Sequence, residues 1–414
     1  MGRGVVFWLG AILGGVSLLF VAGTWIYGMI GPEEDGMPPK MASDPTAMDV
    51  DNHEPSPLTL KKLDWSSVNL SDRFSFRQDG ISITVESTLD PELQQYIIDL
   101  LKRSGTEKAA VVALRPDDGR ILAMVSYDKR GHHERLCLKA DFPAASLFKI
   151  VAAAAAIERA GFTPDRTVYF DGYKYTLYKR QLKQRRGRYT SAISFKRAFG
   201  SSINPVFGKL GIYTLGQEVM ADSAEKFLFN RSIPFDFPVD RSIVKVPEDD
   251  FGLAEIASGF NKKTVISPLH AALLASVVAN DGRLMRPWLI KRVVREDGQI
   301  LYRGGPKKIT DPISRETAED LKILMQETVL HGTCRRSFQR FRRKKAFNEV
   351  EFGAKTGTIN DRTGQFKYDW LTAYAIPPDG DKGICVAVLG VHGEKLGIRA
   401  AKLGRIIINY YLSS

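Results

Sequence analysis

Ser146-Leu147-Phe148-Lys149 opens an alanine-rich apolar segment that continues to Gly161. An apolar run of this length ended by glycine predicts a helix that begins near Ser146. Residues three apart on a helix face the same side, so the Lys149 amine can reach the Ser146 hydroxyl. A serine hydroxyl is a poor nucleophile until a neighbouring base takes its proton, and a desolvated lysine can be that base.

Two further strings, Ser202-Ile203-Asn204 and Lys355-Thr356-Gly357-Thr358, follow in chain order. Each string alone is a common surface feature, but together the three predict an acyl-serine active site that attacks a peptide or lactam carbonyl. Lys355 would be a second cation that lowers the pKa of the Lys149 amine. Gly357 lies in a strand-like stretch, where glycine often marks the close approach of a ligand backbone.

Strand patterns lie at both ends of the globular part. Residues 81–85 alternate with period two, and two apolar runs, 110–114 and 121–125, flank a Pro-Asp-Asp-Gly turn. The C-terminal strand-like segments are 352–358, 371–376 and 384–391. The fold class predicted is therefore α+β, with one antiparallel sheet built from the two ends of the chain.

Helical patterns fill most of the remaining sequence. The expected helices are 90–101, which begins with an Asp-Pro cap, an amphipathic helix from Pro268 to Val278, and a final helix at 398–412. Helices and loops are expected between residues 161 and 351. These helices would cover the sheet.

The N-terminus contains no charged residue from Val5 to Ile30. About 20 apolar residues span a bilayer, so the sequence predicts one transmembrane anchor at residues 5–30 after a cytoplasmic tail at 1–4. The alternative, a cleaved signal peptide, would have a shorter apolar region. A proline-rich extracytoplasmic tether at 31–79 and one domain at 80–414 would follow, with the domain outside the cytoplasmic (inner) membrane.

The net charge of +12 is concentrated in two basic runs, 174–188 and 335–345. Tyrosines interleave the first run, which in a cytosolic protein would indicate single-stranded nucleic acid; the expected topology removes that partner. The open alternatives are solvated loops and contacts with anionic lipids or anionic envelope polymers. Cys137, Cys334 and Cys385 show no metal-binding spacing, and we expect neither a metal nor another cofactor.

The chain resembles the transpeptidase domain of the high-molecular-mass penicillin-binding proteins over roughly residues 80–412. Beyond the three strings, the similarity rests on Thr88–Gln94, Val112–Met124, Ile266–Leu269, Ala279–Gly282, Gly332-Thr333 and Trp370. One mild departure is Pro143-Ala144-Ala145 where the family often has Pro-Gly before the serine.

The resemblance implies a peptidoglycan D,D-transpeptidase that cross-links stem peptides and is a target of β-lactam antibiotics. Ser146 would be the nucleophile, Lys149 its base, Ser202 a proton relay, and Asn204 a substrate-positioning residue. Lys355 would supply positive charge. Thr356, Gly357 and Thr358 would bind substrate, with the N–H groups of Ser146 and Thr358 as the oxyanion hole.

Three other functions remain open. A serine β-lactamase or a D,D-carboxypeptidase would share the acylation chemistry and differ in hydrolysis, but one common β-lactamase class needs a Glu-x-x-Leu-Asn string that this sequence lacks around Glu248 and Glu255. A β-lactam-sensing receptor without turnover would need an output domain. The fate of a penicillin adduct at Ser146 distinguishes these functions.

Overall fold

The computed structural model describes residues 71–414 except 79, 132–134, 343–348 and 362. The predicted anchor at 5–30 and nearly all of the predicted tether lie outside these residues. Within the described part of the chain, no helix is both long and apolar enough to cross a bilayer. The described fold nevertheless starts upstream of residue 80, because Arg73–Gln78 forms a strand.

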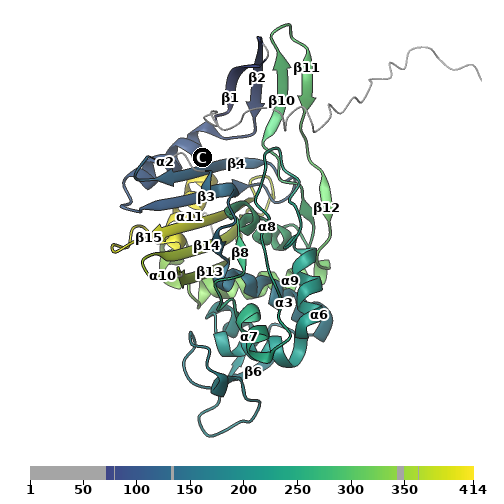
Figure 1. The fold of residues 1–414 in the computed structure, drawn as a ribbon, viewed down its shortest axis with the longest axis vertical. Coiled ribbons are helices and arrows are strands. Elements are labelled where there is room, and N and C mark those ends of the chain that lie inside the picture. Colours follow the sequence, from purple (N-terminus) through teal and green to yellow (C-terminus); the bar gives the residue numbers. More distant parts are fainter. Residues whose placement is uncertain (1–70, 79, 132–134, 343–348, 362) are drawn as a thin grey trace, which may run out of the picture. The chain divides into compact units, whose positions relative to one another are not determined.

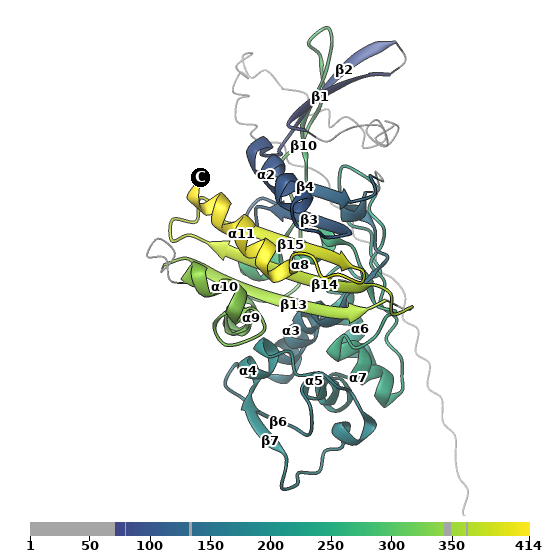
Figure 2. The ribbon, with the colours of Figure 1, turned by 90° about the vertical axis from the view of Figure 1, so that its left-hand side faces the viewer.

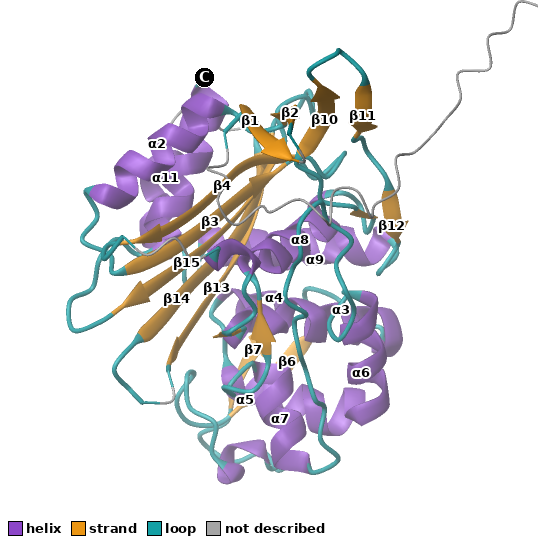
Figure 3. Ribbon diagram, turned by 45° about the horizontal axis from the view of Figure 1, so that its top comes forward, coloured by secondary structure: helices purple, strands orange, loops and turns teal. Residues whose placement is uncertain are grey.

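The central sheet is antiparallel and has five strands. In spatial order these are β13 (Glu351–Asn360), β14 (Lys367–Ile376), β15 (Ile384–His392), β3 (Lys108–Leu114) and β4 (Ile121–Asp128). The pairing of β15 with β3 joins the two ends of the chain, as predicted from the sequence. Figure 3 shows this sheet edge on, with helices on both sides.

Each face of the sheet has its own apolar core. The first face packs on α2 (Pro91–Lys102) and α11 (Ala400–Ser413), and the opposite face packs on α8 (Pro268–Ala279). The prediction that α8 is amphipathic was wrong: all twelve of its residues are buried, because the helix lies between the sheet and the remaining helices. The two other predicted helices, α2 and α11, are confirmed.

A second sheet was missed by the sequence reasoning, which correctly predicted a strand at 81–85 but expected mostly helices and loops in the middle of the chain. Its strands are β1 (Arg73–Gln78), β2 (Ile81–Ser87), β10 (Ile290–Arg295) and β11 (Ile300–Arg303). Two hydrogen bonds of 2.6 Å join the Arg292 guanidinium to the Glu86 carboxylate across β2 and β10. Figure 1 shows this sheet at the upper end of the molecule.

Most of the remaining helices lie beyond the β13 edge of the central sheet (Figure 2) and are called the helical part here. Its helices are α3 (Lys149–Ala160), α4 (Phe195–Gly200), α5 (Asn204–Leu210), a π-helical turn (Gly211–Leu215), α6 (Gly216–Lys226), α7 (Asp250–Ser258) and α9 (Arg315–Leu330). The helix α10 (Arg335–Arg342) instead packs on α11 and α9. Short strand pairs are β5 (Phe142–Pro143) with β8 (Val265–Ile266), β6 (Thr167–Phe170) with β7 (Ser191–Ser194), and β9 (Leu284–Met285) with β12 (Lys308–Thr310).

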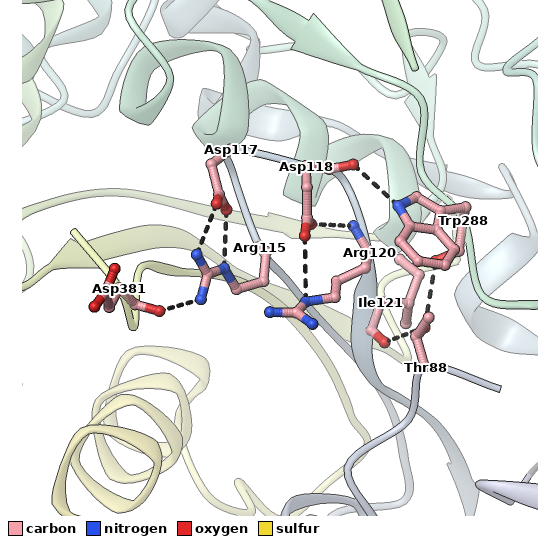
Figure 4. Close-up of polar contacts among 8 residues, drawn as sticks. All are labelled: Thr88, Arg115, Asp117, Asp118, Arg120, Ile121, Trp288 and Asp381. Atoms are coloured by element: carbon pink, nitrogen blue, oxygen red, sulfur yellow. Dashed lines mark hydrogen bonds and ion pairs between the residues drawn. The ribbon is translucent and has the colours of Figure 1, made fainter. Parts of the chain in front are cut away.

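The turn between β3 and β4 is fixed by side chains (Figure 4). Arg115 donates two hydrogen bonds to the Asp117 carboxylate, at 2.9 and 2.6 Å, and a further one to the Asp381 carbonyl. The Trp288 indole donates to the Asp118 carbonyl at 3.0 Å. The predicted hairpin is therefore confirmed, and its turn contacts both the β14–β15 turn and the segment leading to β10.

Candidate active site

Ser146 lies in a short 3₁₀ turn, Ala145–Phe148, that leads directly into α3. The predicted helix start is therefore correct in position, although its first turn is tighter than an α-helix. Ala145 has a left-handed φ of 48°, an unusual conformation for a residue with a Cβ atom. The preceding segment is held by the Trp370 indole, which donates to the Pro143 carbonyl at 2.9 Å.

Lys149 is fully buried, and its Nζ lies 2.9 Å from Ser146 Oγ and 2.8 Å from Asn204 Oδ1. It also donates to the Ser258 carbonyl at the end of α7. Burial, and to a lesser extent the nearby Lys355, holds the pKa of Lys149 well below its ordinary value. The amine is thus placed and tuned to accept the serine proton.

Lys355 is the second buried lysine of the site. Its Nζ donates to Ser202 Oγ at 3.0 Å and to the Thr356 carbonyl at 2.9 Å. Burial lowers its pKa to about 7, while Cys334 acts in the opposite direction. Ser202 itself has a left-handed φ of 55°, which directs its hydroxyl toward this amine.

β13 carries the third string and is the edge strand of the central sheet. Its Gly357 lies against the nucleophile turn: a Cβ atom there would be 3.1 Å from Ala145 Cβ and 3.3 Å from the Ser146 nitrogen. The Thr356 and Thr333 hydroxyls are 2.6 Å apart, and Thr358 is exposed. An extended peptide can add to such an edge beside Ser146.

The structure brings the predicted site residues of the three strings into one site. Three of their neighbours, Ser258, Gly259 and Asp369, were missed by the sequence reasoning, and Thr333 was noted only as part of the family resemblance. Asp369 accepts from Thr358 Oγ1 at 3.4 Å and from the Arg399 guanidinium at 2.8 and 3.0 Å. The glycine after α7 and the Gly-Thr pair before β13 were visible signals; nothing in the sequence marked Asp369.

This arrangement is suited to acyl transfer. A hydroxyl, a buried amine, a second cation and an open strand edge meet at Ser146. Among the described residues, no carboxylate makes a hydrogen bond with Ser146 or Lys149. Cys137, Cys334 and Cys385 are all buried free thiols.

The buried lysines make a testable prediction about stability. Because the folded-state pKa of Lys355 is below its ordinary value, the unfolded chain binds more protons between about pH 7 and 10.5. The free energy of unfolding is therefore expected to rise with pH across this window. Lys355→Met should flatten that rise in urea unfolding, and the exposed Lys402→Met is the control. An unchanged slope in Lys355→Met would contradict the burial argument.

Comparisons with known proteins agree with this geometry. The family model described as the penicillin binding protein transpeptidase domain matches residues 109–407. The peptidoglycan D,D-transpeptidase PbpA of Mycolicibacterium smegmatis is 28% identical over 82% of this chain and 74% of its own length. The PbpA sequences of Mycobacterium tuberculosis are also 28% identical.

Solved structures of the same kind superpose on this fold. Penicillin-binding protein A from Mycobacterium tuberculosis, as an imipenem acyl-enzyme complex, matches with a TM-score of 0.64 and 26% identity over 79% of each chain. The D,D-transpeptidase domain of a peptidoglycan glycosyltransferase from Eggerthella lenta gives a TM-score of 0.63 at 23% identity, covering 80% of this chain and 82% of its own. The chain therefore belongs to the penicillin binding protein transpeptidase domain family.

Proposed function

We propose that this chain is a peptidoglycan D,D-transpeptidase that works through an acyl-enzyme on Ser146. The observation that supports it most directly is the 2.9 Å contact between Ser146 Oγ and the fully buried Lys149 amine, whose pKa is lowered by burial. Two relatives that match this chain over 74% of their own length are named peptidoglycan D,D-transpeptidases.

In the first half-reaction, Ser146 Oγ attacks the carbonyl between the two terminal D-alanines of a donor stem peptide. Its proton passes to Lys149 Nζ, and the N–H groups of Ser146 and Thr358 stabilise the oxyanion. The C–N bond then breaks, and the proton held by Lys149 is relayed through the Ser202 hydroxyl to the leaving D-alanine nitrogen, which leaves Lys149 neutral again. Lys355, 3.0 Å from that hydroxyl, supplies positive charge.

In the second half-reaction, an amine of another stem peptide attacks the ester carbonyl. Its proton passes to Lys149, which then gives a proton to the Ser146 oxygen as the ester C–O bond breaks and the new amide is released. Asn204 holds a substrate amide, and the Thr356 and Thr358 hydroxyls at the β13 edge bind the donor carboxylate. Fast hydrolysis is disfavoured because no described carboxylate makes a hydrogen bond with Ser146 or Lys149, so the site lacks the glutamate base that activates water in one common β-lactamase class.

A labelled penicillin tests this function. We expect intact-mass analysis of the full chain in neutral detergent to show one long-lived adduct that peptide mapping places on Ser146 and that Ser146→Ala lacks. With donor stem peptide and an acceptor amine, the wild type should form a cross-linked dimer. Absence of any adduct would overturn the acyl-enzyme mechanism. An adduct lost within seconds would instead identify a β-lactamase. Release of D-alanine without formation of the cross-linked dimer would identify a carboxypeptidase.

The proposal includes membrane attachment. Residues 5–30 would be a single-pass anchor, and residues 31 to about 70, up to the start of the described fold, an extracytoplasmic tether. The following domain would act outside the cytoplasmic membrane, where anionic lipids and envelope polymers are available to the basic runs. We expect external protease to release the domain from spheroplasts. Protection of the domain until lysis would contradict this topology.

A further inference from the structure

The loop between β6 and β7, residues 171–190, carries a concentrated positive charge and is called the basic loop here. Its cations are Lys174, Lys179, Arg180, Lys183, Arg185, Arg186 and Arg188. All seven are exposed, and none forms an ion pair with a carboxylate among the described residues. The one acidic residue, Asp171, already contacts Lys209 at 3.3 Å and Thr190 at 2.6 Å. The charge of the loop is thus uncompensated.

The basic loop has a fixed internal structure. The buried Gln181 side chain donates to the carbonyls of Asp171 and Tyr173, at 2.8 and 3.1 Å, and accepts from the Tyr178 N–H at 2.9 Å. Leu177 and Leu182 are buried in a small apolar cluster with Ala254 of α7. A solvated linker would not have these buried contacts. They fix the backbone of the loop and therefore the positions of its exposed side chains.

Several of these cations are stacked on aromatic rings. The Arg186 guanidinium lies 3.6 Å from the centre of the Tyr169 ring, and Arg180 lies 5.3 Å from that of Tyr178. Stacking orients a guanidinium while leaving its edge N–H groups open for a carboxylate. The exposed rings of Tyr173 and Tyr189 extend the same surface.

A pocket of about 320 Å³ lies behind the loop, a volume within the range of small-ligand sites. Three cations line it: Arg166, Arg186 and Lys209. Tyr213 forms part of its wall and donates a hydrogen bond to the Leu182 carbonyl of the loop at 2.9 Å. None of the lining residues that the structure describes is acidic, so the pocket suits an anionic group.

The basic loop is continuous with the active site through Asn204. The Asn204 N–H donates to the Lys174 carbonyl at 2.7 Å, and its Nδ2 donates to the Tyr175 carbonyl at 3.0 Å. Its third contact, through Oδ1, is with Lys149. One residue therefore connects the backbone of the loop at residues 174 and 175 to the general base.

We propose that the basic loop and its pocket form a second substrate subsite that binds carboxylate groups of a peptidoglycan stem peptide outside the reacting residues. The inference rests on the proposed function, because only a peptidoglycan substrate would bring such a peptide to Ser146. An arginine guanidinium can bind a carboxylate through two parallel hydrogen bonds, and tyrosine rings pack on peptide and sugar surfaces. Contact with the active site favours a substrate strand over a membrane as occupant.

The test uses full-length protein in neutral detergent, with Ser146 already acylated by penicillin so that the catalytic site is blocked. The probe is a soluble, uncross-linked peptidoglycan strand, compared with the same strand after conversion of its carboxylates to amides. We expect the peptidoglycan strand with free carboxylates to bind, and its affinity to fall as the salt concentration rises. The combined variant Arg185→Gln, Arg186→Gln, Arg188→Gln should bind about tenfold less tightly, as the loss of three exposed ion pairs would give.

The matched control neutralises three exposed cations on and after the β10–β11 hairpin, at the other end of the molecule (Lys291→Gln, Arg303→Gln, Lys307→Gln). It should bind as the wild type does. Three results would overturn the subsite. The amidated peptidoglycan could bind as tightly as the carboxylate form, the control variant could lose as much affinity as the loop variant, or the loop variant could bind as tightly as the wild type. Loop-dependent binding of phosphatidylglycerol vesicles without binding of the strand would also overturn it, in favour of a lipid contact. The penicillin acylation rate of each protein tests the proposed function separately. Failure of the subsite can therefore be distinguished from failure of the transpeptidase proposal.

Discussion

Replacing Lys149 with alanine is expected to lower the rate of penicillin acylation at Ser146 by about a thousandfold. In the wild type, the Lys149 amine lies 2.9 Å from Ser146 Oγ, and burial favours its neutral, proton-accepting form. No other described titratable side chain makes a hydrogen bond with that hydroxyl. The measurement is the time course of labelled-penicillin incorporation at several penicillin concentrations, which separates the acylation step from binding.

The control is Lys149→Arg, because arginine carries a positive charge at this position but cannot be deprotonated in a protein. It should lose as much acylation rate as the alanine variant. Thermal unfolding of both variants shows whether the domain is still cooperatively folded. If a folded Lys149→Arg protein were acylated at nearly the wild-type rate, Lys149 would act through its charge, and its role as the base would be wrong.

Much of the central sheet was predictable because its strands have a local signal. β15 is an uninterrupted apolar run, as expected for a strand that is buried on both faces. β10 was missed because Ile290–Arg295 mixes three basic residues with its apolar ones, and its pairing with β2 joins residues about 200 positions apart. Its stability as a strand comes from that distant partner, which no local pattern specifies.

The active-site contacts likewise divide into local ones, which the sequence predicts, and long-range ones, which it does not. Ser146 and Lys149 are three residues apart, so helix geometry alone predicts their contact. The Ser258 carbonyl reaches Lys149 across 109 residues, and Asp369 reaches Thr358 only through the pairing of β13 with β14. Such neighbours depend on how the elements pack, so they could be found only in the folded structure.

Gly259 is one of these neighbours, and Gly259→Ala is expected to slow penicillin acylation by about a hundredfold, the usual effect of moving a catalytic group by about 1 Å. Gly259 ends α7 with a left-handed φ of +66°. A Cβ atom there would lie only 1.9 Å from the Ala145 carbonyl oxygen and 3.0 Å from the Ser146 nitrogen. The turn that holds Ser146 must therefore shift.

Gly105→Ala separates this displacement from backbone strain. Gly105 has nearly the same φ, +68°, but a Cβ atom there would meet no heavy atom within 4 Å. Gly105→Ala should lose about 1–2 kcal/mol of unfolding free energy from the left-handed conformation, measured by urea unfolding. Gly259→Ala should lose more, because its Cβ also meets the Ala145 carbonyl oxygen. Only Gly259→Ala should lose acylation, because only its Cβ contacts the nucleophile turn. Equal acylation rates in the two variants would show that the Ser146 turn tolerates the shift and that its close packing on Gly259 is not needed for catalysis.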